Sequence, residues 1–339
     1  MPTTFLRAGS VLAVASALAL AAFVGTHPAR AAEYTMKLGV LSINDAEHGF
    51  EKRLKVAIEK ATKGRVEVNI FPRGQLGSPA AHVEGLQLGT IEGVVMPPDF
   101  FASVDPRMGV FSIPFLFKSR DQANKVLQNK ELYDYVLDML DSKGIVGMTL
   151  AAHADGRYIA RNPIRKLSDF AGKKMRVNAT DAERERMKRL GASAIPMGLA
   201  DMVTSLQSGV IDGTMSGMSI HANFHLESIS KILLKTEDTL LISYGGLSKK
   251  WLDSLPADLR KTVVDTARGM QKDMVEETDL ENKNLTQSWL DRGGQFITFS
   301  AAEMAEMHKK LDTVGEAVTQ KPPELKAFYE KMKAYSAKY

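Results

Sequence analysis

Strand-like and helix-like segments alternate between residues 34 and 96, and this alternation restricts the fold more than any other feature of the sequence. Residues 66–71 alternate apolar and polar side chains with period two, whereas 48–62 places its apolar residues on one helical face and ends before Gly64. The predicted order is strand 34–41, helix 48–62, strand 66–71, helix 80–88 and strand 91–96. This order predicts an α/β unit with a largely parallel sheet.

A second α/β set follows. Ser119, Thr180 and Ser300 each begin a capping box, in which two side chains bond free N–H groups at a helix start. One long helix is predicted over 256–290, and its only glycine, Gly269, leaves it open to a kink. Its Met-rich apolar stripe has helical spacing and is predicted to be core. The other predicted elements are helix 119–142, strand 144–151, helix 180–191, helix 201–207, strand 210–215, a strand region 240–247 interrupted by Gly245-Gly246, strand 295–299 and a helix from 300.

A chain of 339 residues exceeds what one compact core usually holds, so two α/β lobes are expected. The sequence has no internal repeat and no linker-like segment between them. We therefore expect the chain to cross between the lobes more than once, as in hinged two-lobe proteins. The expected lobes are 33–154 plus 242–282 and 155–241 plus 283–339, with the long helix bracing both.

Composition excludes several classes of function. The chain has no cysteine, which removes disulfides, thiolate nucleophiles, Cys-ligated zinc, iron–sulfur clusters and a lipid-modified N-terminal cysteine. The 44 basic residues barely exceed the 40 acidic ones, no long basic block occurs, and aromatic residues make up only 7%. Nothing in this balance indicates a nucleic-acid partner.

Residues 1–31 have the pattern of a secretory signal peptide. Arg7 supplies the positive charge, 11–24 is an uncharged run, and Ala29 and Ala31 are small residues at the two positions that a signal peptidase reads. The alternative is a membrane anchor, but roughly 14 apolar residues fall short of the ~20 that a span needs. We expect cleavage near Ala31 and a periplasmic location, where ATP and NADH are not supplied.

Motifs that indicate common enzymes are missing from the sequence. The chain has no Walker loop, no GxGxxG after a strand, no GxSxG elbow and no HExxH. His221 and His225 stand four residues apart, which would place two imidazoles on one helix face, but no third ligand has a recognisable spacing. We interpret them as two solvated surface histidines and expect neither a metal nor a cofactor.

Ordered sequence blocks cover nearly all of the chain after the signal segment. The most informative are GRY at 156–158, LSDFAGKKMRV at 167–177, LGASAIPM at 190–197 and a stretch over 200–213 that ends in LQSGVIDG. Further blocks are FPRGQLG at 71–77, EGLQLGTIE at 84–92 and WLDSLP at 251–256. This order resembles the substrate-binding proteins of tripartite ATP-independent periplasmic (TRAP) transporters, the DctP-type family.

The resemblance implies an α/β fold of the periplasmic-binding-protein type, a clam shell of two lobes joined by hinge strands and a long bracing helix. It implies a receptor rather than an enzyme, which captures a small organic acid by hinge closure. The partners it implies are separately encoded small and large membrane subunits, and transport driven by an ion gradient. Two alternatives remain, namely a secreted hydrolase acting on a carboxylated substrate and a solute receptor that feeds a sensor kinase.

In this family, the arginine that closes the GKKxRV-like strand forms a two-pronged salt bridge to the ligand carboxylate, and Arg176 holds that position. A guanidinium fits this role because it presents paired donors in one plane, stays charged and is costly to bury without a partner. The alternative is that Arg176 pairs with an internal acid. Arg157 matches a second arginine that many members direct at the ligand, with an internal or surface salt bridge as its alternative.

The remaining candidate residues are expected to shape the rest of the ligand site. The loop 96–98 falls where the first lobe of the family touches the ligand, and ligands bind at the carboxyl ends of strands in open α/β sheets. Many relatives carry an acidic or amide residue after Asp212-Gly213, whereas this chain has Met215 and Ser216. This difference disfavours a cation-bridged or polyhydroxylated ligand and favours a small or apolar monocarboxylate. The expected contacts are Met96 and Pro97 in the loop, Leu199 and Met197 as apolar walls, Ser216 as a donor and Asp238 as an acceptor.

Overall fold

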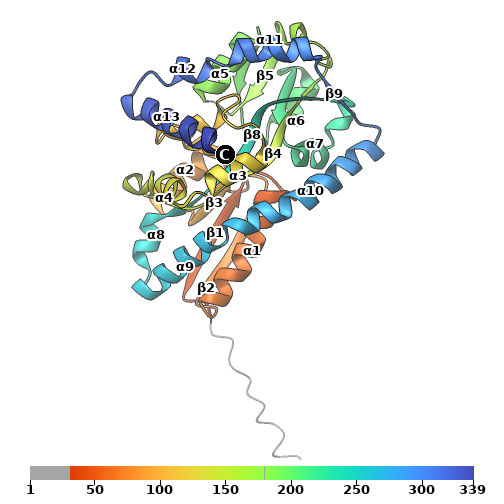
Figure 1. Ribbon diagram of the computed structural model, residues 1–339. Helices are drawn as coiled ribbons and strands as arrows, with labels where there is room; N and C mark the ends of the chain where they lie inside the picture. Colours follow the sequence, from red (N-terminus) through yellow and green to blue (C-terminus); the bar gives the residue numbers. More distant parts are fainter. Residues whose placement is uncertain (1–30, 179) are drawn as a thin grey trace, which may run out of the picture.

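The computed structural model describes residues 31–178 and 180–339. The predicted signal peptide therefore lies outside the described residues, apart from its last residue. Within these two ranges, no helix combines the length and the apolar composition that a membrane span requires. The described chain is built on one mixed β-sheet with helices packed around it (Figure 1).

The sheet is continuous and has the order β2-β1-β3-β8-β4-β7-β5-β6, with β9 beside β8. Parallel pairs form its two ends, whereas β4 and β8 run antiparallel to each other and to β7 and β3. We call the part around β1–β3 the first lobe and the part around β5–β7 the second lobe. The strands are β1 (Tyr34–Val40), β2 (Val66–Phe71), β3 (Gly93–Met96), β4 (Ile145–Ala160), β5 (Lys174–Val177), β6 (Ser193–Pro196), β7 (Gly213–Ser216), β8 (Ile232–Ser248) and β9 (Gln295–Thr298).

The strands β4 and β8 are long enough to belong to both lobes. The sequence predicted only 144–151 and 240–247, but β4 has 16 residues and β8 has 17. The end of β8 pairs with β3 in the first lobe, and the end of β4 pairs with β7 in the second. The expected interruption at Gly245-Gly246 was wrong, because both glycines continue the strand. A Cβ on Gly245 would collide with the Met148 side chain, which explains the small residue there.

The pairing between β4 and β8 is irregular where these strands pass from one lobe to the other. The register shifts between Ala152 and Ala154, and again between Asp155 and Arg157. Such bulges bend a strand and redirect its side chains. The bend lies between the two lobes, which is the position that a hinge requires.

Helices complete each lobe. In α1 the N-cap Asp45 accepts a hydrogen bond from the His48 N–H (3.1 Å), and the buried Phe50, Leu54 and Ile58 face the core of the first lobe. The helices are α1 (Ala46–Ala61), α2 (Pro79–Leu88), α3 (Arg120–Leu127), α4 (Lys130–Asp138), α5 (Asp181–Arg189), α6 (Met202–Ser208), α7 (Met218–Asn223), α8 (Lys249–Ser254), α9 (Ala257–Gly269), α10 (Gln271–Asp291), α11 (Ala301–Leu311), α12 (Val314–Val318) and α13 (Pro323–Lys338). Two 3₁₀ helices, Pro98–Phe101 and Pro106–Ser112, follow β3.

Two of the predicted helices are each divided in the structure. The helix expected over 119–142 is α3 followed by α4, because Asn129 begins a new helix by accepting a hydrogen bond from the Leu132 N–H (3.3 Å). The helix expected over 256–290 is α9 followed by α10, which meet at Met270. The capping boxes of α5 and α11, which begin at Thr180 and Ser300, are confirmed.

The pair α9 and α10 braces the two lobes. The helix α9 packs on α1 in the first lobe, and α10 continues past β4 to α7 in the second lobe (Figure 1). The predicted apolar stripe is core, since Leu259, Val263 and Met274 are buried. The long brace expected from the sequence is therefore present, with one break.

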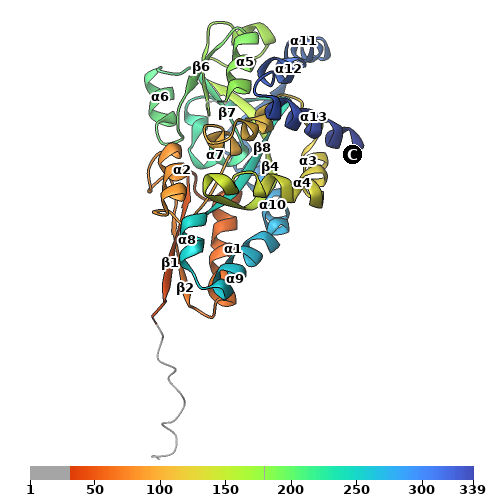
Figure 2. The same cartoon turned by 90° about the vertical axis from the view of Figure 1, so that its left-hand side faces the viewer.

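The C-terminal helix makes a further connection between the lobes. The helices α11 and α12 pack on α5, but α13 packs on α3 and on the 3₁₀ helix Pro106–Ser112 (Figure 2). The Gln122 side chain donates to the Ser336 carbonyl (2.8 Å), and the Ser336 hydroxyl donates to the Leu116 carbonyl (2.8 Å). The lobe boundaries expected from the sequence stay a prediction, and α13 contacts residues that they assign to the other lobe.

We expect Gly147→Ala to destabilise the protein by about 1–3 kcal/mol, because the site in β4 is closely packed. A Cβ there would lie 2.6 Å from the Leu137 Cα and 2.8 Å from the Tyr244 hydroxyl oxygen. Thermal unfolding would measure the change. The control is Gly269→Ala at the end of α9, where nothing lies within 4 Å and a gain of about 0.4–1 kcal/mol is expected. Equal melting temperatures for the two variants would contradict close packing at Gly147.

Candidate functional site

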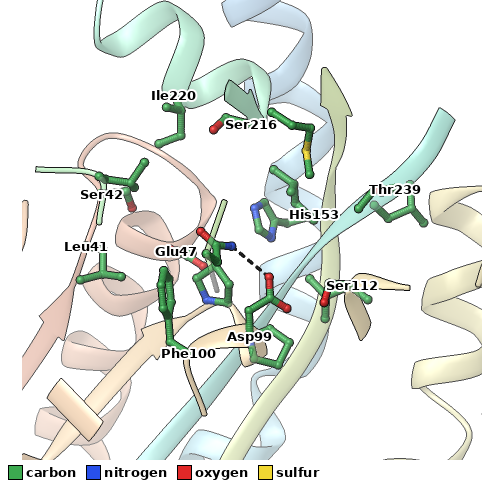
Figure 3. A pocket seen from close by; sticks show the side chains of 18 of the residues that line it. Leu41, Ser42, Glu47, Asp99, Phe100, Ser112, His153, Ser216, Ile220 and Thr239 are labelled. Atoms are coloured by element: carbon green, nitrogen blue, oxygen red, sulfur yellow. Dashed lines mark hydrogen bonds between the residues drawn. The ribbon is translucent and has the colours of Figure 1, made fainter. Parts of the chain in front are cut away.

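A cavity of about 790 Å³, which includes its opening to solvent, lies between the two lobes. The first lobe contributes the segment that joins β1 to α1 and the segment after β3. The second lobe contributes the ends of β5 and β7 and part of α7. Residues 239–242 of β8 and His153 of β4 line it at the bend of the two shared strands (Figure 3). Both lobes and both hinge strands therefore contact the same space.

Arg176 lines this cavity from β5, which lies between β6 and β7. Only 6% of the residue is exposed, and its Nε donates to the Met197 carbonyl (2.8 Å). Its Nη2 is buried and has no hydrogen-bond partner among the described residues. Burial lowers the pKa of Arg176 to about 10, and the nearby Glu183 and Asp99 oppose this shift. At neutral pH the guanidinium is therefore charged, largely dry and still able to donate hydrogen bonds.

The structure brings together half of the ligand-binding residues expected from the sequence. Those that line the cavity are Arg176, Pro97, Leu199 and Ser216. Those that do not line it are Arg157, Met96, Met197 and Asp238. Met96 is fully buried in β3, and Met197 lines a neighbouring cavity while its carbonyl holds Arg176. Direct contact of any of these eight residues with a ligand stays a prediction.

Arg157 makes its contacts inside the second lobe. Its Nη1 donates to the Asp155 carbonyl (3.3 Å), its Nη2 lies 3.7 Å from Asp155 Oδ2, and its guanidinium carbon lies 5.8 Å from the centre of the Phe296 ring. This arrangement matches the salt-bridge alternative rather than the ligand contact. A register shift between Asp155 and Arg157 lies directly before this side chain, and bulges of this kind can redirect side chains.

Asp238 belongs to an internal polar network. It is 1% exposed and accepts hydrogen bonds from the Tyr158 hydroxyl (2.9 Å) and from the Thr236 hydroxyl. Its Oδ2 also lies 3.5 Å from Arg186 Nη1, and Arg186 is itself 1% exposed. These groups already use the carboxylate oxygens, and Asp238 lies behind the cavity lining in a structural network, so its expected contact with a ligand hydroxyl stays a prediction.

Several acidic side chains that were not predicted from the sequence line the cavity. The Ser243 hydroxyl donates to Glu47 Oε1 (2.6 Å) and lies 2.9 Å from His153 Nδ1. Burial raises the pKa of Glu47 well above its ordinary value, and the charge of Asp45 adds to this shift. Burial lowers the pKa of His153 to about 4, so its ring is neutral at pH 7.

Polar contacts join the two lobes beside the cavity. Asp99 Oδ2 in the first lobe accepts a hydrogen bond from Asn178 Nδ2 in the second (2.9 Å; Figure 3). Burial raises the pKa of Asp99 to about 7, and the charge of Glu183 adds to this shift. Asn223 Nδ2 in α7 donates to the carbonyls of Ile43 (3.2 Å) and Asn44 (2.6 Å) in the first lobe. These contacts hold the lobes together around the cavity.

The two histidines considered as metal ligands lie in different environments. His221 is fully buried, and its Nε2 lies 3.1 Å from the Arg157 carbonyl and 3.0 Å from the Ser216 carbonyl. The expectation of a solvated His221 was wrong, because α7 packs against β4 and α10. His225 is exposed, as expected. Among the residues described, no three His, Asp or Glu side chains are grouped so as to hold a metal ion.

A sequence signal for part of the acidic lining was present. Ser42, Asp45 and Glu47 follow β1, and the rule that ligands bind at the carboxyl ends of parallel strands applies to β1 as well as to β3. Ligand contacts were predicted from that rule only at 96–98. His153 had no such signal, because its position depends on the bend of a strand whose length was underestimated.

The chain is similar to characterised and uncharacterised proteins along most of its length. A model of the family described as "Bacterial extracellular solute-binding protein, family 7" matches residues 39–322. The C4-dicarboxylate-binding periplasmic protein DctP of Rhodobacter capsulatus is 28% identical over 317 residues, which are 91% of this chain and 92% of that protein. The uncharacterized protein YiiZ of Salmonella typhimurium is 34% identical over 157 residues, which span 46% of this chain and about half (48%) of that protein.

Solved structures share the fold. A TRAP periplasmic solute binding protein from Xanthobacter autotrophicus, solved with bound β-D-galacturonate, is 26% identical and superimposes with a TM-score of 0.82. The match covers 88% of this chain and 99% of that chain. The two-lobed sheet described above is therefore a known architecture.

We expect Glu51→Gln to stabilise the protein by about 1–3 kcal/mol at pH 8 and by less at pH 5. Glu51 is fully buried, and a backbone hydrogen bond from Val95 offsets only part of the cost of burying its charge. Burial, with the charges of Glu47 and Asp45, raises the pKa of Glu51 well above 4.5. The native state then binds more protons than the unfolded state, so the cost of ionising Glu51 grows as the pH rises.

Melting temperatures of both proteins at pH 5 and pH 8 would test this prediction. The exposed Glu67→Gln on β2 is the control and should show no such pH dependence. A shift in melting temperature that is the same at both pH values would contradict a raised pKa for Glu51.

Proposed function

We propose that this chain, which belongs to the family 7 bacterial extracellular solute-binding proteins, captures a small organic acid by binding its carboxylate to Arg176. The family match bears out the resemblance to TRAP solute-binding proteins, and the clam-shell fold agrees with a solved member. The family consists of solute-binding receptors. One observation carries the proposal for this chain: a buried guanidinium with an unfilled donor lines the cavity between the lobes.

A carboxylate is the group that best completes this site. A guanidinium in a dry pocket lacks the water that would solvate it, so an anion with two oxygens in one plane replaces that water and fills the free donors. The Met197 carbonyl holds Nε, which leaves Nη1 and Nη2 for the ligand. Leu199, Pro97 and Phe100 supply apolar surface in the same cavity. This combination supports an acid with an apolar portion.

Closure of the lobes around the ligand follows from the position of the cavity. Its lining comes from both lobes, and the Asp99–Asn178 and Asn223–Ile43 contacts join them. When the lobes close, they exclude water and so strengthen the ion pair with Arg176. The bulged part of β4 and β8 is the proposed hinge.

The hydrolase alternative gains no support from the contact among Ser243, His153 and Glu47. Ser243 is fully buried, and its hydroxyl donates to Glu47 instead of to the histidine ring. In a catalytic triad the histidine lies between the serine and the acid and accepts the serine proton, whereas here the serine lies between the other two residues. Ser243 therefore lacks both exposure and a general base in the right place.

We also propose that residues 1–31 direct export and that the receptor works in the periplasm. The name of the Rhodobacter relative, a periplasmic protein, supports this location. Delivery of the ligand to small and large TRAP membrane subunits is proposed from family membership, as is coupling to an ion gradient. Recognition by those subunits would depend on the closed form.

Arg176→Lys should weaken binding of the acid by about 2–4 kcal/mol, because an ammonium cannot reproduce the planar pair of donors. The fold should persist, since lysine keeps the charge and a long side chain. Isothermal titration calorimetry with the best acid from a thermal-shift screen would measure the change. Lys173→Arg, which lies outside the cavity lining, is the control. Unchanged affinity in Arg176→Lys would remove this residue from the ligand site.

A saturating acid should reduce the radius of gyration of the wild-type protein, because ligand closes the lobes. Small-angle X-ray scattering with and without the acid would show this. The control is the matched amide of the same acid, which lacks the charge that Arg176 binds. Identical scattering profiles with and without the acid would refute hinge closure.

A further inference from the structure

The cavity that contains Arg176 is rich in acidic side chains. Asp45 and Glu47 line it from the start of α1, Asp99 from the 3₁₀ helix after β3, and Glu183 from α5. All four accept hydrogen bonds from the protein: Glu183 completes the capping box of α5, Asp99 accepts across the lobes, Asp45 caps α1, and Glu47 accepts from the Ser243 hydroxyl. Asp45 and Glu47 differ from Glu183 in position, because they bring two neighbouring carboxylates from the first lobe to a cavity whose arginine comes from the second.

The surroundings of Asp45 and Glu47 are unfavourable for two ionised carboxylates. Burial raises the pKa of Asp45, and burial together with the charge of Asp45 raises the pKa of Glu47. Glu51, one turn further along α1, is buried behind them. On α10, burial and the charge of Asp45 raise the pKa of Glu281 to about 8, which Arg53 opposes. A positive charge placed beside Asp45 and Glu47 would relieve this repulsion.

Hydrogen bonds around Glu47 leave acceptors for a ligand. With Glu47 ionised, the single hydroxyl proton of Ser243 is donated to Glu47, so Ser243 accepts from the Nδ1–H of His153. The Nε2 atom of His153 then carries a lone pair, and this ring lines the cavity (Figure 3). Ser42, which is 1% exposed, also lines it, and its hydroxyl lies beside the Asp45 and Glu47 carboxylates, where it lowers their pKa values without offsetting the effect of burial. A donor-rich ligand group would complete this part of the site.

We infer that the ligand is a zwitterion whose carboxylate binds Arg176 and whose ammonium group lies beside Asp45, Glu47 and His153. This inference rests on the proposed function, because it assumes that Arg176 holds the carboxylate. An ammonium group offers three donors and a positive charge, which match the acceptors and the excess of acid. A hydroxyl group would fill an acceptor without offsetting the charge.

A dicarboxylate fits this wall of the cavity poorly. The start of α1 would otherwise favour a second anion, because a helix N-terminus carries partial positive charge. Here Asp45 caps that terminus and Glu47 follows it in the first turn, so a second ligand carboxylate would meet like charge. The acidic wall therefore selects against dianions while Arg176 still selects for a carboxylate.

Acids that share a carbon skeleton test the inference. Protein freed of ligand by unfolding and refolding is titrated at pH 7.5 with 4-aminobutanoate, 4-hydroxybutanoate, butanoate and succinate. A smaller set, alanine, lactate and propanoate, and a cyclic set, proline and cyclopentanecarboxylate, extend the range of sizes. In every set that binds, the amino acid should bind at least about tenfold more tightly than the carboxylates that lack its ammonium group. Succinate should bind most weakly in its set. If a carboxylate without an ammonium group, or succinate, bound as tightly as the amino acid or more tightly, the inference would be overturned.

Two variants separate this inference from the proposed function. Glu47→Gln keeps an oxygen for the Ser243 hydroxyl but removes the charge, so it should weaken the best amino acid by about tenfold or more and leave its hydroxy acid within about twofold. Arg176→Lys should weaken all carboxylates alike. The control is Glu84→Gln on the exposed face of α2, which should change neither. Melting temperatures confirm that each variant is folded.

The outcomes are distinguishable. If Glu47→Gln weakens amino acids and hydroxy acids equally, Glu47 has a structural role and the inference fails. If carboxylates bind through Arg176 and an added ammonium group does not strengthen their binding, the inference fails while the proposed function stands. If no acid in any set binds, the proposed function itself fails, and the inference fails with it.

Discussion

The antiparallel pairing of β4 with β8 is the constraint on which the rest of the structure depends. Both strands run through the sheet from one parallel end to the other, so the two lobes share one continuous ladder of hydrogen bonds. The register shifts twice near the middle of the ladder, between Ala152 and Arg157, and once more between Gly147 and Thr149 in the first lobe. The same few residues therefore join the lobes, permit bending and line the cavity with His153 and 239–242. Rigidity within each lobe and flexibility between them have one structural source.

The sequence predicted the local elements well where the signal is local. Period-two alternation identified β2, and capping boxes identified the starts of α5 and α11, because these patterns involve residues within one turn or one strand. Prediction from the sequence failed where residues far away in the chain determine the length or continuity of an element. The full length of β8 depends on β3, β4 and β9 as neighbours, and Gly245-Gly246 continues the strand because Met148 and Ile145 fill the space beside it. The split at Asn129 was missed because a single side-chain cap divides an otherwise continuous helical pattern.

The candidate site shows the same division between local and distant signals. Arg176 could be identified because the residue type and its place at the end of a strand in a family motif both indicate carboxylate binding. Arg157 and Asp238 have equally suitable side chains, yet the first lies against Phe296, and Arg186 and Tyr158 enclose the second. Such differences arise from packing between elements far apart in the chain. The pairing of Glu47 with Ser243 and His153 joins three such elements.

The position of α13 limits how the lobes can move. The chain crosses between them in β4 and β8, passes along the brace of α9 and α10, and returns through α13 to α3. Because these three connections lie at different places between the lobes, together they resist rotation of one lobe about the long axis of the molecule. They still allow the lobes to open about the bulges. The edges of the two lobes that meet when the lobes close are therefore aligned in the same way each time. The membrane subunits proposed above would then meet a surface of constant shape, whichever molecule lies inside.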